Sequence, residues 1–324
     1  MSQRARKVSS ASSGVRENLA NRALTAALKT RRSLAVALHE SICVYDAAEE
    51  LGVEVRFDPI PSMEGMYVRH TLEGVGPHIL VCSQRPAGRQ AMTASHELGH
   101  HVFNHGTRID EYVQGVGTVG RALVPEPTGQ VRDLFDPDEF LADVFGAFFL
   151  MPKSAVERGF SVRGIAASQA KPLDVLAVAG WLGVGYTALV YHVCLSLRLV
   201  TWSRAQELLS KTPRALREEQ LGRALSADLY MVDSRWTGRP VDLKIGDVAI
   251  VPDETVVEPV SGRFASGRAA AARLQAANGR TLVEATSVGI SRIVGSGWAT
   301  FVRVAEREYQ GRNAYRHLEA VDDD

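Results

Sequence analysis

The stretch TASHELGHHVFNHG, residues 93–106, constrains the fold of this chain most, because it holds four of the nine histidines. It contains no proline, and up to Phe103 its only glycine is Gly99, so it is predicted to form a helix. On a helix, residues four positions apart lie one above the other. His96 and His100 therefore project in one direction and can reach one metal ion at about 2.0–2.1 Å.

Glu97 stands one step round the predicted helix, where its carboxylate can hold a water on that ion rather than bind the ion itself. This is the H-E-x-x-H arrangement, in which two histidines bind zinc and the glutamate is the general base. The alternative is a polar helix that is merely rich in histidine. An apolar face indicates burial, and buried histidines need partners, which favours the metal site; that face consists of Ala94, Leu98, Val102 and Phe103.

His101 and His105 form a second pair four positions apart, on a face turned about 100° away. No glutamate stands at the matching place beside them. We interpret both as rim or surface residues.

A third zinc ligand is predicted in a later apolar helix, DPDEFLADVFGAFFLMP, residues 136–152. Catalytic zinc takes three protein ligands and a water, and Glu139 and Asp143 lie four apart there, as in the Glu-x-x-x-Asp pattern of thermolysin-like enzymes. In this interpretation Glu139 binds zinc, and Asp143 accepts a hydrogen bond from a ligand histidine. Asp136 and Asp138 are rivals in the expected cap region. Glu139 can also be an exposed acid favoured by the helix dipole.

The segments RQAMTASHELGHHVFNH and DEFLADVFGAFFLMP together resemble the ImmA/IrrE family of bacterial metallopeptidases, over roughly residues 50–155. Ser95 and Gly146 depart from the family pattern. His100 and Glu139 also stand 39 positions apart (139 minus 100), which predicts an inserted segment near 106–135. The resemblance implies a thermolysin-like zinc fold that cuts a partner repressor once and switches on genes in response to stress or mobile elements.

The pattern along the chain predicts an α+β protein with four regions. They are a flexible basic N-terminus (1–30), a zinc metallopeptidase domain (31–160), a helix-turn-helix-like segment (161–228) and a β-rich domain (229–324). In the second region we expect a helix from Arg31 to Gly52, strands at 53–59, 65–70 and 78–83, and a loop or lid over 106–137.

In the third region, residues 172–200 indicate a helix, a Gly-Val-Gly turn and a second helix, and 203–227 continue as helix. This segment can pack or contact DNA; the candidate DNA contacts are Thr187, Tyr191, His192 and Arg198. The β-rich region is expected to include a helix near 264–278.

Composition limits the binding partners and the cellular compartment that we expect for this chain. The formal net charge is zero, which gives no overall electrostatic case for nucleic acid. The three cysteines lack C-x-x-C spacing, which favours a reducing, cytoplasmic protein without disulfides. No apolar run has the length of a membrane span. The first 32 residues hold eight Lys or Arg and one acid, as a transit peptide, a nucleic-acid-binding arm or a flexible end would.

The combined prediction is a zinc endopeptidase in which His96, His100 and Glu139 hold Zn²⁺ and Glu97 is the base. A further donor for the oxyanion is expected, with Tyr67 as the first candidate and Tyr112 and His105 as others. The resemblance makes a helix-turn-helix repressor the protein substrate. The alternative is a DNA-binding transcription regulator with a structural or vestigial zinc site, although structural zinc normally has four protein ligands.

Overall fold

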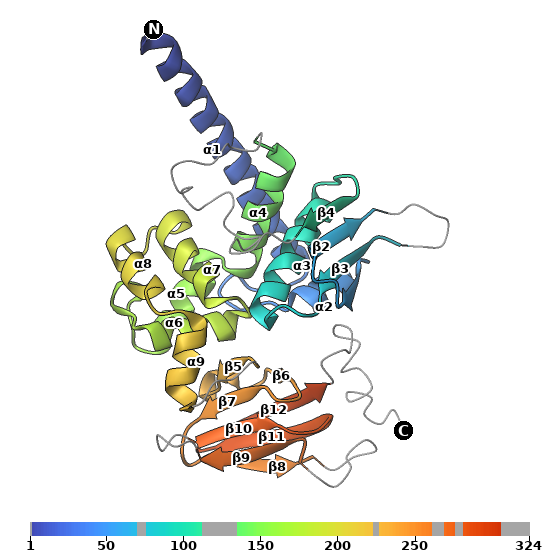
Figure 1. Cartoon of the computed structure of the whole chain (residues 1–324), viewed down its shortest axis with the longest axis vertical. Helices are drawn as coiled ribbons and strands as arrows, with labels where there is room; N and C mark the ends of the chain where they lie inside the picture. The colour runs from blue at the N-terminus through green and yellow to red at the C-terminus, as the bar shows by residue number, and fades with distance from the viewer. Residues whose placement is uncertain are drawn as a thin grey trace.

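The computed structural model describes residues 2–69, 76–111, 135–222, 227–260, 269–275 and 281–305. Figure 1 shows a long N-terminal helix, a small sheet with helices against it, a helical region and a β-rich region. The fold is α+β, as predicted from the sequence.

The first sheet has four strands in the order β1-β3-β2-β4. Strands β1 (Glu54–Asp58), β2 (Met63–Val68) and β3 (His78–Cys82) confirm the three predicted strands. β4 (Arg108–Glu111) lies within the segment predicted as a loop. β1 and β3 are parallel, whereas β2 runs antiparallel to both β3 and β4, so that β4 is an edge strand. Most of the predicted loop lies outside the described residues.

Helix α3 (Ala87–Val102) is the predicted motif helix, and it is buried from Gln90 to His100. One side of α3 contacts β2 and β3, and another packs against α4 (Pro137–Leu150). The short helix α2 (Val44–Glu50) lies against α3 and β1. This complete enclosure explains how a helix with two histidines and a glutamate becomes part of the core.

The N-terminus differs from the prediction of a flexible arm, because residues Ser2–Ser33 form helix α1 along α4 (Figure 1). Ala23 and Ala27, four positions apart, are fully buried in this contact. Arg31 is also buried, and its guanidinium donates to the carbonyl oxygens of Phe149 at 2.7 Å and Glu40 at 2.5 Å. Basic composition suggested a solvated arm, but small residues on one face allow α1 to pack closely.

The helix expected from Arg31 to Gly52 is interrupted. α1 ends at Ser33, Ala35 has a positive φ of 54°, and the next helix begins only at Val44. Arg31 donates to carbonyls of this connection, so tertiary bonding replaces the helical pattern that the leucine spacing predicted.

The helical region follows α4 directly. Its elements are α5 (Lys153–Ser161), a short 3₁₀ turn (Ala167–Gln169), α6 (Pro172–Leu182), α7 (Tyr186–Tyr191), a π-helical segment (His192–Ser196), α8 (Trp202–Leu209) and α9 (Pro213–Leu221). The predicted helix, turn and helix over 172–200 is confirmed. Gly183 ends α6 with a φ of 74°, a left-handed conformation that favours glycine.

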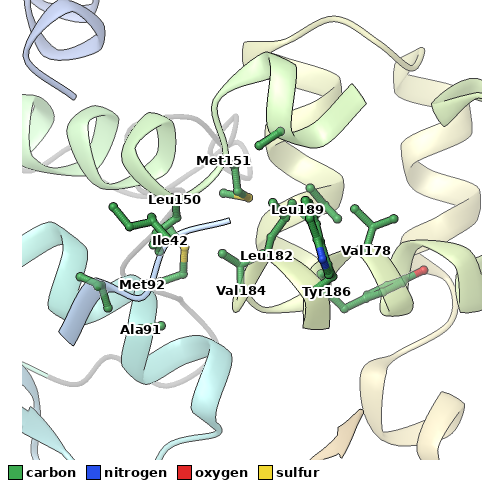
Figure 2. Close-up of a cluster of buried hydrophobic side chains, with 14 of the residues drawn as sticks. Ile42, Ala91, Met92, Leu150, Met151, Val178, Leu182, Val184, Tyr186 and Leu189 are labelled. Atoms are coloured by element: carbon green, nitrogen blue, oxygen red, sulfur yellow. The ribbon is translucent and has the colours of Figure 1, made fainter. Parts of the chain in front are cut away.

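This helix pair packs against the motif helix and the end of α4. Figure 2 shows one cluster in which Met92 of α3, Leu150 of α4 and Met151 lie near Leu182 and Leu189 of the pair. In the described part of the chain no single helix is long and apolar enough to cross a membrane. The bent pair Pro172–Leu182 and Tyr186–Ser196 meets that test only when taken together, by length and composition, with a bend of 103°.

The β-rich region holds two four-stranded sheets, ordered β5-β7-β10-β9 and β6-β12-β11-β8. Its strands are β5 (Leu229–Met231), β6 (Val241–Lys244), β7 (Val248–Val251), β8 (Val256–Pro259), β9 (Ala271–Gln275), β10 (Thr281–Ala285), β11 (Gly289–Gly295) and β12 (Trp298–Ala305). A 3₁₀ turn, Ser234–Trp236, stands between the first two. The helix predicted near 264–278 is wrong for residues 271–275, which pair with β10 in antiparallel register. Its other described residues, 269 and 270, are not helical, and the rest of that prediction lies outside the described residues.

The β-rich region and Asp228, which precedes it, contact the motif helix and α6. A carboxylate oxygen of Asp228 accepts a hydrogen bond from the backbone nitrogen of Ala87 at 2.8 Å. Lys244 Nζ lies 3.1 Å from Oε1 of Gln90, and Arg239 donates to the carbonyl oxygen of Trp181 at 2.5 Å. The boundary predicted near residue 228 thus falls between α9 and β5, at a place where the two parts are joined by hydrogen bonds.

Candidate metal centre

Three side chains from two helices converge on one point. The Nε2 atoms of His96 and His100, both on α3, lie 3.0 Å apart. The Glu139 carboxylate of α4 places Oε2 3.3 Å from His96 Nε2 and Oε1 3.6 Å from His100 Nε2. Bonds of about 2.0–2.1 Å in tetrahedral directions put ligand atoms about 3.3 Å apart. The three predicted ligands therefore have the spacing that one zinc ion requires.

The outer nitrogen of His96 supports this assignment. Its Nδ1 lies 2.8 Å from Oδ1 of the buried Asp143, so the ring proton belongs on Nδ1 and the lone pair on Nε2. His100 Nδ1 likewise has a partner, at 2.9 Å, in Nδ1 of His105. If both rings keep their protons on Nδ1, two lone pairs face each other across 3.0 Å, an arrangement that a cation between them stabilises. The residues present fit a zinc ion.

The three acids at the start of α4 have different partners. Asp136 is the N-cap, and its side chain accepts from the backbone nitrogens of Asp138 at 2.8 Å and Glu139 at 3.4 Å. Asp138 is held by Arg108 of β4, whose Nη2 lies 2.7 Å from Oδ2. The two rivals are thus used elsewhere, and Glu139 alone of the three joins the histidines in the three-residue group.

Glu139 is suited to bind a cation as a carboxylate. Burial raises the pKa of its carboxyl, but in the metal-free state, when the rings are protonated on Nε2, hydrogen bonding and charge interactions with His100 and His96 outweigh burial and hold the pKa well below its usual range. Its side chain is 35% exposed, while those of His96 and His100 are nearly inaccessible. The solvent-facing side of the site is therefore the side of Glu139.

Glu97 is fully buried on α3, one position from His96, and lies against the backbone of β2. A Cβ on Gly65 would stand 2.6 Å from Oε1 of Glu97 and 2.4 Å from Cγ2 of Thr93. The sequence pattern placed Gly65 where a turn meets the start of a strand and did not mark it as a site residue. A glycine inside a strand often marks a close approach, and that signal was available in the sequence.

A second close approach fixes the distance between the two helices of the site. A Cβ on Gly99 would lie 2.9 Å from Cα of Ala142, and one on Gly146 would lie 2.9 Å from Oγ of Ser95. Ser95 and Gly146, the two departures from the family pattern, therefore face each other at this crossing. The missing methyl group on α4 leaves space for the additional hydroxyl on α3.

An ion-pair network fastens the start of α3 to β2 beside Gly65. Glu64 is 2% exposed, and its two carboxylate oxygens accept from Nε of Arg85 at 2.9 Å and Nε of Arg89 at 2.8 Å. Sequence analysis did not select these residues. Because Glu64 adjoins Gly65, this network fixes the position of β2 at the place where β2 lies against Glu97.

The two remaining histidines of the motif have different surroundings. His101 Nδ1 lies 3.1 Å from the hydroxyl of Tyr67, away from the three-ligand group. Tyr67 as an oxyanion donor therefore gains no support from its position. His105 was interpreted as a rim or surface residue, but its side chain is only 8% exposed and its Nδ1 contacts Nδ1 of His100. Burial lowers the pKa of both His101 and His105. Tyr112 lies outside the described residues.

The family comparison agrees with this geometry. Residues 48–163 match the Peptidase_M78 family model, described as the IrrE N-terminal-like domain. These residues form an IrrE N-terminal-like domain. The matched segment contains the first sheet, the motif helix, α4 and α5, and it makes up less than half of the 324 residues. The resemblance found over roughly 50–155 is confirmed.

Comparison with other proteins adds little. No curated protein matched the chain. Among solved structures, the cysteine protease inhibitor EhICP2 from Entamoeba histolytica matched at 8% identity with a TM-score of 0.15, over 24% of this chain and 96% of the inhibitor. A TM-score of this size does not indicate a shared fold.

Proposed function

We propose that the IrrE N-terminal-like domain of this chain is a zinc-dependent endopeptidase that hydrolyses a peptide bond in a partner protein. The family match assigns a metallopeptidase-type domain to residues 48–163. One observation carries the finer proposal. His96, His100 and Glu139 place three ligand atoms within 4.8 Å of one another, and Glu97 stands next to the first ligand on the same helix.

Each residue has a distinct task in this proposal. His96, His100 and Glu139 hold the ion, and Asp143 keeps the proton of His96 on Nδ1. Zinc, when bound, polarises the scissile carbonyl and lowers the pKa of a water towards about 7. Glu97 accepts a proton from the attacking water on a carboxylate oxygen and passes it to the leaving amine.

The edge strand β4 offers a way to align an extended substrate. In the described part of the sheet, β4 pairs with β2 on one side only. Arg108 of β4 reaches Asp138, the neighbour of Glu139, so this strand borders the metal centre. Extended peptides can bind an open sheet edge through backbone hydrogen bonds, with specificity from alternate side chains.

The partner we propose is a helix-turn-helix repressor, and its cleavage would relieve repression in a stress or mobile-element response in the cytoplasm. The family resemblance supports this choice. The segment of α6 and α7 gives little support to DNA binding as the main role. His192, one of the four candidate DNA contacts, is buried and hydrogen-bonded to the carbonyl oxygen of Met151.

The alternative, a DNA-binding regulator with structural zinc, receives less support. Structural zinc normally has four protein ligands, and only three residues gather at this centre in the part of the chain that the structure describes. A buried glutamate next to the ligands also has no task in a structural site.

The experiment is to look for a helix-turn-helix repressor among the neighbouring genes, to mix it with the zinc-loaded protein and to follow cleavage by mass spectrometry. The proposal predicts one cut that a chelator prevents and that the Glu97→Gln protein does not make. An intact repressor after incubation with zinc-loaded wild type contradicts the repressor as substrate. Zinc loading together with specific DNA binding and no peptidase activity would favour the alternative.

A further inference from the structure

The end of the motif helix folds His105 back onto a zinc ligand. Asn104 has a φ of 58°, and its backbone nitrogen donates to the carbonyl oxygen of His101 at 2.9 Å. The nitrogen of His105 donates to the carbonyl oxygen of His100, also at 2.9 Å. These two hydrogen bonds, together with the left-handed conformation of Asn104, form a Schellman motif. The motif places His105, the residue after the turn, against the last full turn of the helix.

The side chain of His105 is held on both ring nitrogens and on one face. Its Nδ1 lies 2.9 Å from Nδ1 of His100, and its Nε2 lies 3.3 Å from Oδ1 of Asp138. The ring stacks on Phe103, with centroids 5.7 Å apart and planes 21° apart. Asp138 is fixed in turn by Arg108 at 2.7 Å. A chain of contacts therefore runs from His100 through His105 to an ion pair.

These contacts admit one arrangement of protons when His100 binds a metal through Nε2. His100 then carries its proton on Nδ1, and this N–H donates to Nδ1 of His105. His105, accepting there, carries its own proton on Nε2, on the side of Asp138. His96 uses the Asp143 carboxylate directly for the same purpose, whereas His100 reaches a carboxylate through a second imidazole.

We propose that His105 is a positioning residue that fixes the ring orientation and tautomer of His100, and that Asp138 and Arg108 hold His105 in place. The inference deepens the proposed function, on which it rests. It also gives Asp138 a task distinct from that of Glu139, its neighbour in the first turn of α4.

The direct test is the zinc dissociation constant of the full-length protein, measured by chelator competition at one pH. Loss of an outer partner of a ligand typically costs about 10–100-fold in affinity, so His105→Ala should weaken zinc by about that factor. His105→Gln should recover most of the loss, because its amide can accept from His100 and donate to Asp138. His101→Ala is the matched control, since His101 adjoins the ligand but faces Tyr67. It should bind zinc as the wild type does.

A spectroscopic readout separates positioning from general destabilisation. Co²⁺ in place of zinc reports ligand geometry through its visible absorption bands. The spectrum should change in His105→Ala, return towards the wild type in His105→Gln and remain unchanged in His101→Ala. Thermal unfolding of the metal-free proteins shows whether His105→Ala has lost its fold instead.

Wild-type zinc affinity and an unchanged Co²⁺ spectrum in His105→Ala would overturn the inference, and so would an equal loss in His101→Ala. If His105→Ala does not fold, Asp138→Ala decides. This variant keeps both imidazoles and should bind zinc more weakly than the wild type, by a smaller factor than the loss of His105 would cause. Unchanged zinc affinity of Asp138→Ala overturns the inference. Because zinc is measured without substrate, a zinc-loaded protein that cuts nothing contradicts the proposed function and leaves this inference standing.

Discussion

Nδ1 of His96 lies 2.8 Å from Oδ1 of Asp143, four positions beyond Glu139 on the same face of α4. One helix therefore contacts both nitrogens of this histidine, with Glu139 on the inner one and Asp143 on the outer one. The pairing of α3 with α4 builds the centre, and residues on either helix alone leave it incomplete.

Asp143→Asn should weaken zinc binding by about 10–100-fold, because the amide keeps the shape but removes the charge that makes His96 a better ligand. The measurement is a zinc dissociation constant from chelator competition. Glu157→Gln, an exposed acid on α5, is the control and should leave zinc binding unchanged. Equal constants for Asp143→Asn and the wild type would show that this contact does not support the ligand.

Gly65→Ala should separate catalysis from metal binding. The new methyl group would meet Oε1 of Glu97 and Cγ2 of Thr93 at less than 3 Å, so Glu97 must move. Displacement of a catalytic group by about 1 Å can cost about 100-fold in rate, while zinc content should persist. Gly76→Ala, where the nearest atom would lie 3.9 Å away, is the control. An unchanged cleavage rate in Gly65→Ala would show that catalysis does not depend on the position of Glu97 against β2.

The buried His192 should make stability depend on pH. Burial lowers the pKa of His192 to about 4, although its hydrogen bond to Met151 raises it, and an unfolded chain has a pKa of about 6.5. Between these values the unfolded state binds more protons. Stability that is present above pH 6.5 is therefore lost as pH falls, by about 2 kcal/mol between pH 7 and pH 5.

The His192→Gln protein tests this directly, because glutamine can still donate to Met151 but does not titrate. Urea unfolding at pH 7 and pH 5 should show a smaller loss of free energy of unfolding in this variant than in the wild type. His39→Gln, at an exposed position, should keep the wild-type dependence. Parallel pH dependence of the wild type and His192→Gln would show that His192 is not the buried neutral group described here.

The sequence predicted which three side chains gather at the candidate metal centre, because the signals that place them are local. The H-E-x-x-H spacing places two histidines on one face, and the four-residue spacing of Glu139 and Asp143 does the same on the second helix. The contact of His105 with His100 was not predicted, because it depends on a left-handed turn at Asn104 that breaks the helical spacing used to place His105. An asparagine just after a helix is a recognised end signal, so that turn was open to prediction.

The errors in the fold have a common cause in tertiary contacts. Arg31 takes its partners from α4 and the following turn, which ends the helix that the leucine pattern extended to Gly52. The alanine-rich run at 271–275 has helical propensity, yet pairing with β10 makes it a strand. No local pattern identified these contacts, because Phe149 lies 118 positions from Arg31 and residues 271–275 become a strand only by pairing with β10.

The central claim is that His96, His100 and Glu139 hold a zinc ion for which Glu97 is the base. The most direct test measures zinc content and repressor cleavage on the same preparations of wild type, Glu97→Gln and His100→Ala. We predict about one zinc per chain with cleavage in the wild type, the same zinc without cleavage in Glu97→Gln, and neither in His100→Ala. Cleavage by Glu97→Gln at the wild-type rate, or full zinc in His100→Ala, would contradict the account.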